Sequence, residues 1–348
     1  MRWIRDSWKT YSALLVALWP LSLIFRLIIA IRILWFSTKV RPLYYAGPLI
    51  VVGNISIGGT GKTPLIIYLA KYLRNQGFSP GIVSRGYGAQ ATSYPQLVKL
   101  DDDPNYVGDE PLLIARRTMC PVVVDPNRVE AAKYLFSQCD VNVILSDDGL
   151  QHYKMYRDIE ICMVDGSEMF GNSLCLPAGP LREPVERLKN VDFVVVTGAA
   201  DKIEKLQFPN IPMSMKAKSF VNLISGEVRP FGGAPFNIGN NIQAVCGIGN
   251  PERFYSMLES LPYSVTKFSF PDHYQFTSRD FRSDLIAEHQ PVVMTEKDAI
   301  KCADFATKNF WYVETEVAVS ENFLTNLEER IKEKKREIQV NQGTQRHD

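Results

Sequence analysis

A glycine-rich loop followed by lysine and threonine is the segment of this sequence with the clearest chemistry. It reads Gly-Asn-Ile-Ser-Ile-Gly-Gly-Thr-Gly-Lys-Thr-Pro over 53–64 and follows an apolar run. Its glycines let backbone N–H groups curl around phosphate oxygens, while Lys62 supplies a positive charge and Thr63 a hydroxyl for Mg²⁺. The strict P-loop pattern has a glycine where Ser56 stands, so an ordinary glycine-rich turn is the alternative. The predicted nucleotide-phosphate site comprises Ser56, Gly58, Gly59, Thr60, Gly61, Lys62 and Thr63.

A second acidic element should lie at the end of a neighbouring strand, where it can hold Mg²⁺ or its water. The apolar run 141–146 delivers Asp147 and Asp148 to that position. A turn built on Asp-Gly is the alternative reading, but it does not explain the preceding strand together with the P-loop. Either aspartate is a candidate metal ligand, and the sequence does not choose between them.

Short β-branched runs alternate with helix-like stretches after residue 48, which is typical of a parallel sheet covered by helices. The pattern predicts an α/β fold of the P-loop NTPase type, with a mostly parallel sheet, a second and smaller α/β lobe, and a cleft between the two. Predicted strands are 49–52, 81–84, 122–125, 141–146, 159–164, 193–197, 243–246, 266–268, 292–295 and 310–313. Predicted helices are 62–76, 110–117, 128–137, 184–189, 251–261, 278–289 and 321–337.

Shifts in composition predict the division of the chain. The segment around 210–240 is rich in Pro, Gly, Asn and Ser, which indicates β-hairpins and connecting loops. The expected parts are an N-terminal membrane-associated helix at 1–41, a P-loop core at 42–209, a β-hairpin connection at 210–240, a second α/β lobe at 241–337 and a flexible tail at 338–348.

The N-terminal segment is apolar and basic. Residues 10–25 carry no charge, and the apolar pattern continues past them around Arg26 and Arg32. The uncharged stretch is shorter than the roughly 18 residues of a clean span, and Pro20 would kink a helix. Arginines can keep their guanidinium groups wet at a headgroup layer, and four of the five tryptophans lie in this segment. A helix lying in one leaflet is therefore favoured over a transmembrane span, with a buried core helix as the weaker alternative.

Composition excludes several broad classes. The 348 residues include 39 basic and 38 acidic side chains, for a formal net charge of +1, and 46% are hydrophobic. The chain is too apolar for a disordered protein. Its lack of a basic excess argues against general binding of nucleic acid.

Several blocks, in one order along nearly the whole chain, resemble the tetraacyldisaccharide 4′-kinase family, also called lipid A 4′-kinases. Ser56 is consistent with this family, which tolerates a hydroxyl residue there. Beside the P-loop, the blocks are Ser84-Arg85-Gly86-Tyr87-Gly88, Val107-Gly108-Asp109-Glu110-Pro111, Asp125-Pro126-Asn127-Arg128, Asp147-Asp148-Gly149-Leu150-Gln151-His152, Pro177-Ala178-Gly179-Pro180-Leu181-Arg182-Glu183-Pro184, Phe270-Pro271-Asp272-His273-Tyr274 and Thr295-Glu296-Lys297-Asp298.

The resemblance implies transfer of the γ-phosphoryl group of ATP, with Mg²⁺, to the 4′-hydroxyl of a tetraacylated glucosamine disaccharide 1-phosphate. It places the reaction at the cytoplasmic face of the inner membrane, with the membrane surface and a glycolipid as partners. No protein partner is indicated. An acyl-chain substrate would explain why a P-loop domain carries a membrane-seeking helix.

The resemblance also assigns roles to residues. In the family, the aspartate of the Gly-Asp-Glu-Pro block pairs with the histidine of the Asp-His-Tyr block, which corresponds to Asp109 as base and His273. Asp109 could instead cap a helix, and His273 could be an ordinary loop histidine. Lys62 and Asp148 complete the implied catalytic set. The implied substrate-binding residues are Arg85, Tyr87, Arg128, Gln151, His152 and Arg182. For the arginines, the alternative is a solvated surface position with ordinary ion pairs.

Two other functions fit a P-loop with a membrane-seeking helix. One is a membrane-docked ATPase switch that acts on a protein partner, and the other is a nucleotide-sensing scaffold. Pure binding needs no second set of carboxylates aimed at an acceptor, so Asp147 and Asp109 count against the scaffold.

Overall fold

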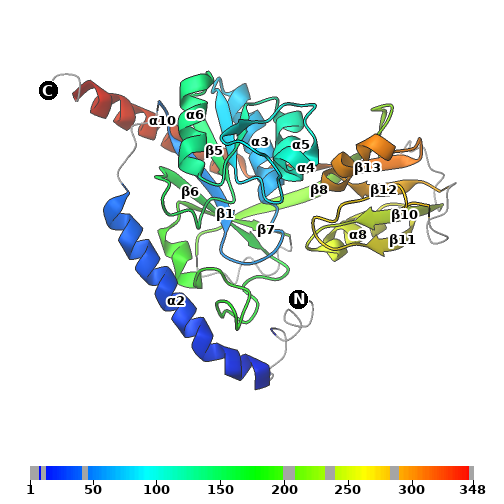
Figure 1. The fold of residues 1–348 in the computed structure, drawn as a ribbon, viewed down its shortest axis with the longest axis horizontal. Helices are drawn as coiled ribbons and strands as arrows, with labels where there is room; N and C mark the ends of the chain where they lie inside the picture. The colour runs from blue at the N-terminus through cyan, green and yellow to red at the C-terminus, as the bar shows by residue number, and fades with distance from the viewer. Residues whose placement is uncertain are drawn as a thin grey trace.

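The core lobe is built on a mostly parallel sheet (Figure 1). The computed structural model describes residue 8 and residues 13–40, 46–198, 208–231, 240–282 and 290–344. The core strands are β1 (Leu49–Asn54), β2 (Pro80–Ser84), β3 (Gln96–Leu97), β4 (Val122–Val124), β5 (Val143–Asp147), β6 (Ile159–Asp165) and β7 (Phe193–Thr197). They lie side by side in the order β7, β6, β1, β5, β2, β4, β3, and β3 pairs antiparallel with β4. The predicted α/β class and parallel sheet are confirmed.

Helices cover both faces of this sheet because each carries an apolar stripe. In α3 (Lys62–Asn75), Leu65, Ile66, Leu69 and Leu73 are buried at the helical spacing that forms one face. With α5 (Asp109–Thr118) it forms one hydrophobic cluster, and α6 (Arg128–Gln138) forms a second with other strand side chains. Shorter pieces are α4 (Pro104–Val107) and the 3₁₀ segment η1 (Val185–Asn190).

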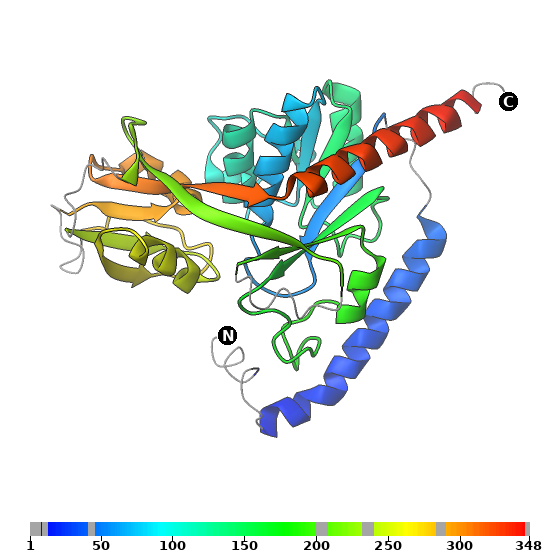
Figure 2. The same ribbon diagram turned by 180° about the vertical axis from the view of Figure 1, so that it is seen from behind.

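Two long antiparallel strands join the core lobe to a second lobe (Figure 2). β8 (Ile211–Asn222) pairs first with β7 and then with β13 (Phe310–Val319). The second lobe contains β10 (Asn241–Cys246), β11 (Ser264–Ser269), β12 (Val292–Thr295), α8 (Pro251–Glu259), α9 (Glu296–Cys302) and η3 (Ala303–Phe305). Within the described residues, one continuous sheet of 13 strands therefore runs through both lobes.

The C-terminal helix differs from its expected place. The sequence suggested that 321–337 belongs to the second lobe and that 338–348 is a flexible tail, but α10 (Glu321–Thr344) is helical to Thr344 and packs on the core lobe. Phe323, Leu327 and Ile331 are buried there. Their spacing of four residues gives the helix an apolar stripe, and β13 delivers it back to the core.

Two other predictions need correction. The helix expected at 278–289 is a turn over its described part, 278–282, in which Asp280 accepts hydrogen bonds from the backbone N–H and hydroxyl of Thr277; residues 283–289 lie outside the described residues. In 210–240 the expected hairpin exists, because β9 (Val228–Arg229) pairs with β8, but β8 is also a long strand that continues into the core. Residues 232–239 lie outside the described residues.

The N-terminal helix α2 (Ala13–Lys39) lies along the edge of the core lobe and continues through Pro20 (Figure 1). Most of its described apolar side chains are exposed, and it touches the core through polar contacts: Ser22 Oγ donates to the carbonyl of Cys175 at 2.8 Å, and the Arg26 guanidinium lies 3.9 Å from Glu186. Residues 14–39 have a mean hydropathy of 2.4 over their most apolar window, so this helix is long and apolar enough to cross a membrane.

Candidate active site

The P-loop connects β1 to α3 through residues whose backbone favours glycine. Gly58 has φ = 125° and Gly61 has φ = 85°, conformations that L-residues with a Cβ rarely adopt. A Cβ at Gly61 would also lie 3.3 Å from Cγ2 of Thr197 on β7. Lys62 is then the first residue of α3, so the loop presents the helix N-terminus to the cleft. Ser56 is buried and bridges to Leu181 through its backbone, outside the cavity described below.

The predicted acidic pair lies directly beside this loop. β5 pairs in parallel with β1, with Val52 opposite Asp147, so the two strands end together. The Lys62 ammonium lies 3.4 Å from Asp148 Oδ1, and Arg182 Nη1 donates to Asp148 Oδ2 at 3.2 Å. Asp148 has φ = 48°, an uncommon conformation for a residue other than glycine. This geometry turns its carboxylate toward the P-loop lysine.

The surroundings of the two aspartates shift their pKa values in opposite directions. Burial, together with the nearby charges of Glu110 and Asp148, raises the pKa of Asp147 to about 7. Burial also disfavours ionisation of Asp148, but Lys62 and Arg182 outweigh it and lower the pKa of that carboxyl. Asp147 Oδ1 is buried and accepts no hydrogen bond from any residue the structure describes. A buried, unpaired carboxylate oxygen in the cavity that Thr63 of the P-loop also lines fits a hard cation such as Mg²⁺, which binds few protein ligands and shares its others with phosphate and water.

The arginine, glutamine and histidine of the neighbouring blocks surround the same acidic turn. Arg128 Nη2 donates to the backbone carbonyls of Asp147 (3.1 Å) and Asp148 (2.9 Å), so this buried arginine fixes the turn itself. Gln151 Nε2 donates to the carbonyl of Asn54, at the end of β1, at 2.9 Å. Burial and the charges of Arg128 and other cations lower the pKa of His152 to about 4, so its ring is neutral at pH 7.

On the opposite wall, Asp109 and His273 meet across the two lobes. His273 Nδ1 lies 3.3 Å from Asp109 Oδ2. The His273 backbone has φ = 58°, and the centroid of its ring lies 5.2 Å from that of Tyr87. Asp109 is the first residue of α5 rather than its N-cap, although its Oδ1 accepts a hydrogen bond from the Glu110 N–H at 2.8 Å. The predicted pairing is therefore present in the geometry.

Electrostatics keeps this aspartate ionised. Burial alone would raise the pKa of Asp109, but the hydrogen bond from His273 and the charges of Lys297 and Lys301 lower it. The same hydrogen bond raises the pKa of His273, against burial and the charge of Lys297. A histidine whose pKa is raised by a buried carboxylate can, together with that carboxylate, accept a proton from a bound hydroxyl.

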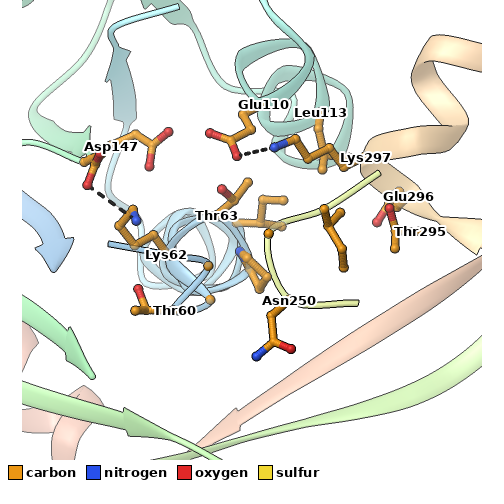
Figure 3. Close-up of a pocket in the computed structure, with 18 of the residues that line it drawn as sticks. Thr60, Lys62, Thr63, Glu110, Leu113, Asp147, Asn250, Thr295, Glu296 and Lys297 are labelled. Carbon is orange, nitrogen blue, oxygen red and sulfur yellow. Dashed lines mark hydrogen bonds and ion pairs between the residues drawn. The ribbon is translucent and has the colours of Figure 1, made fainter. Parts of the chain in front are cut away.

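One cavity of about 1360 Å³ joins the two walls, and side chains from both lobes line it (Figure 3). The predicted residues that line it are Gly58, Gly59, Thr60, Gly61, Lys62, Thr63, Arg85, Tyr87, Arg128, Asp147, Asp148, Gln151, His152, Arg182 and His273. Asp109 lies just behind His273, and Ser56 lies outside.

Sequence reasoning missed charged residues that also line this cavity. Arg253 of α8 reaches from the second lobe to Thr197 Oγ1, under the P-loop, at 3.3 Å. Arg117 of α5 pairs with Glu296 (2.7 Å) and Glu314 (2.9 Å) of the second lobe and its connecting strand. No isolated motif surrounds Arg117. Arg253 ends the stretch Gly-Ile-Gly-Asn-Pro-Glu-Arg, which carries a helix-start signal directly after a predicted strand. That signal could have predicted that Arg253 lies in the first turn of a helix at the end of the sheet.

A P-loop that faces a carboxylate–histidine pair across one cleft defines a P-loop kinase, an enzyme class that moves a phosphoryl group to a hydroxyl. The family model described as tetraacyldisaccharide-1-P 4′-kinase matches residues 14–332. The chain belongs to this family.

Related proteins match this chain along nearly its full length. A tetraacyldisaccharide 4′-kinase of Nitrosococcus oceani is 46% identical over 90% of this chain and 93% of its own, and one of Hahella chejuensis is 41% identical over 95% and 97%. Among solved structures, LpxK from Aquifex aeolicus in complex with ATP superposes with a TM-score of 0.73 at 28% identity, over 91% of this chain and 99% of that chain.

Proposed function

We propose that this protein transfers the γ-phosphoryl group of ATP to the 4′-hydroxyl of a tetraacylated glucosamine disaccharide 1-phosphate. The observation that carries the proposal is the single cavity in which Lys62 and Asp148 stand on one wall and His273, backed by Asp109, on the other. Family membership supports the lipid acceptor, and the ATP complex of the Aquifex aeolicus relative supports the donor.

On the donor side, the P-loop backbone from Gly58 to Gly61 would cradle the phosphates, and Lys62 would neutralise their charge. Thr63 and one or both of Asp147 and Asp148 would hold Mg²⁺. The ion would supply charge neutralisation on the β- and γ-phosphate oxygens. Arg128 supports this arrangement because it holds the backbone of the acidic turn.

On the acceptor side, the Asp109–His273 pair would accept the proton of the 4′-hydroxyl as the new oxygen–phosphorus bond forms and ADP leaves. The His273 ring lines the cavity and would meet the hydroxyl, while Asp109 behind it would orient the ring and stabilise its charge. Arg85, Arg182, Tyr87, Gln151 and His152 line the adjoining wall, where guanidinium forks suit a sugar phosphate and neutral polar groups suit hydroxyls.

The direct test is incubation of the purified full chain with γ-labelled ATP, Mg²⁺ and detergent-dispersed disaccharide monophosphate, followed by chromatography of the lipid. Label on the lipid supports the proposal. Unlabelled lipid after long incubation with a folded protein contradicts it, and a matched reaction with Lys62→Ala should show no transfer.

Membrane association at the cytoplasmic face of the inner membrane is part of the proposal. The exposed apolar side chains of α2 support it, and Arg32 of this helix lines the same cavity as the P-loop, which would bring an acyl-anchored sugar near the donor. Sedimentation with anionic vesicles tests it: the full chain should pellet and a chain lacking residues 1–38 should not. Full pelleting of the shortened chain would exclude the anchor.

A membrane-docked ATPase switch that acts on a protein partner is the alternative. It would hydrolyse nucleotide without a lipid acceptor and at a rate that depends on the partner. The Asp109–His273 pair argues against it, because a switch needs no base aimed at an acceptor hydroxyl. Labelled phosphate on the disaccharide in the test above would exclude it.

A further inference from the structure

Arg32 of the N-terminal helix α2 lines the cavity, but the proposed reaction gives its charge no role. It shares this cavity with Lys62 and Asp148, whereas most of the described apolar side chains of α2 face outward. The helix flanks the core lobe on the side that faces away from the second lobe (Figures 1 and 2). The cavity is thus lined from one side by a membrane-seeking helix and from the other by the second lobe.

The ring of Tyr153 holds this arginine in position. Tyr153 is buried and directly follows His152 of the acidic-turn block. The guanidinium carbon of Arg32 lies 5.6 Å from the centroid of the tyrosine ring, a cation–π contact. Phe36 stacks on the same ring, with the two centroids 6.5 Å apart. Because residues four apart share one face of a helix, the docking of this face on Tyr153 also directs Arg32 to the cavity.

The other cations that the structure describes on α2 have different surroundings. The Arg26 guanidinium lies 3.9 Å from Glu186, and Lys39 Nζ lies 3.7 Å from the centroid of the Trp35 ring. Neither of these two cations lines the cavity. Of the described cations of α2, Arg32 is therefore the one that a ligand in the cavity can reach.

Positive charge exceeds negative charge in this part of the cavity. The Asp148 carboxylate is already paired with Lys62 and Arg182. Among the residues that the structure describes, neither Arg32 nor Arg85 has a carboxylate within 4.0 Å. A guanidinium group without a counter-ion in a cleft suits a phosphate, whose oxygens accept its forked hydrogen bonds.

The neighbouring His152 responds to the same excess of positive charge. Burial, followed by the charges of Arg128, Arg157 and other cations, lowers the pKa of its imidazole to about 4. Its Nε2 atom is buried and forms no hydrogen bond with any residue in the described part of the chain. Buried polar atoms are normally paired, so this nitrogen also fits a site that a polar ligand completes.

We infer that Arg32 binds the 1-phosphate of the acceptor and makes the enzyme specific for a disaccharide that carries this phosphate. The inference rests on the proposed function, which supplies the acceptor. The chemistry recognised is a phosphate group on a lipid, and it has two possible sources, the acceptor itself and a phospholipid of the surrounding bilayer. The acceptor is favoured because Arg32 lines the cavity that holds Lys62, and not the outward face of α2.

The kinetic test uses the purified full chain in a neutral detergent, with the disaccharide 1-phosphate and with the same disaccharide lacking that phosphate. Arg32→Met should lower kcat/KM for the phosphorylated acceptor by about tenfold or more, the range for a hydrogen bond to a charged group. For the acceptor without the phosphate, kcat/KM should change by less than about twofold, and so should KM for ATP. Arg32→Lys keeps the charge without the planar fork and should fall between the two.

Lys39→Met is the matched control, because it removes one positive charge from the same helix outside the cavity. Its kinetics with both acceptors should match the wild type. Equal losses with both acceptors in Arg32→Met, a change confined to KM for ATP, or the same loss in Lys39→Met would overturn the inference. A loss that appears only after anionic phospholipid is added to the detergent would assign Arg32 to the bilayer and would also overturn it.

A second measurement does not depend on catalysis. The phosphorus NMR resonance of the disaccharide 1-phosphate, recorded with saturating full chain in the same detergent and without ATP, should shift on binding to the wild type. With Arg32→Met it should return toward the position of the free lipid, and with Lys39→Met it should not. Equal shifts with the wild type and Arg32→Met would overturn the inference. If the wild type transfers no phosphate to the disaccharide, the proposed function fails, while this resonance still reports on Arg32.

Discussion

The two walls of the cleft are assembled in different ways. The donor wall, with Lys62, Asp147, Asp148 and Arg182, comes from the core lobe alone, and Lys62 and Arg182 each lie within 3.4 Å of the Asp148 carboxylate. The acceptor wall needs Asp109 from the core and His273 and Lys297 from the second lobe. A nucleotide site can thus exist in one lobe, whereas the base depends on how the lobes meet. Variants of each wall should therefore affect different kinetic constants.

The largest effect is expected at the donor wall. Lys62→Ala removes the cation that faces the transferred phosphate, and phosphoryl transfer should fall by about 10³-fold or more. The loss should appear with both ATP and lipid saturating, measured as labelled lipid per unit time. Lys133→Ala, at an exposed ion pair on α6, is the matched control and should be near wild type. Near-normal turnover in Lys62→Ala would remove the P-loop assignment.

The acceptor wall should respond in kcat. Asp109→Asn keeps the size of the side chain but removes the charge that raises the pKa of His273, so kcat should fall by about 10²–10⁴-fold. KM for ATP should change by less than about twofold, because the donor wall is intact. Steady-state kinetics with varied ATP measures both constants, and Asp101→Asn on an exposed loop is the control. An unchanged kcat would show that another group takes the proton.

The donor wall was also the more predictable of the two. Its loop, lysine and acidic turn are contiguous in sequence, and parallel strands end at the same edge, so Val52 and Asp147 were expected to be neighbours. The pairing of Asp109 with His273 was suggested only by resemblance, since no local pattern links residues so far apart. Lys297 as a neighbour of both depends on the packing of α5 on α9, which periodicity does not reveal.

The errors in the fold have the same origin. Strands with continuous apolar runs, such as 49–52, were predicted correctly because burial on both faces requires that pattern. The position of α10 was wrong because the sequence shows an apolar stripe but not the surface that it covers. The strand β8 is longer than the predicted hairpin required, because it pairs along most of its length with β13, which is distant in sequence.

A moderate effect is expected where the lobes meet. Arg117→Met removes the ion pairs with Glu296 and Glu314 and leaves both carboxylates partly buried. The second lobe should then hold His273 less precisely, and kcat should fall by about tenfold with little change in ATP binding. The adjacent Arg116→Met, whose side chain is exposed, is the control. A selective rise in KM for ATP would indicate instead that Arg117 serves the donor wall.

The smallest effect is a dependence of stability on pH. The pKa of His273 is raised by Asp109 in the folded protein, so its stabilising contribution is complete below its ordinary value, about 6.5, and is lost as pH rises through the higher folded pKa. The pKa of Asp109 is lowered in the folded protein, so the contribution of this carboxylate to stability is lost only as pH falls below the usual range of aspartate. Urea unfolding should therefore separate wild type from His273→Asn more at about pH 6 than at about pH 9, by less than about 1 kcal/mol, since the imidazole is 29% exposed. A larger separation at the alkaline pH would mean that the folded protein favours the neutral imidazole, and the ion pair would not hold the lobes together.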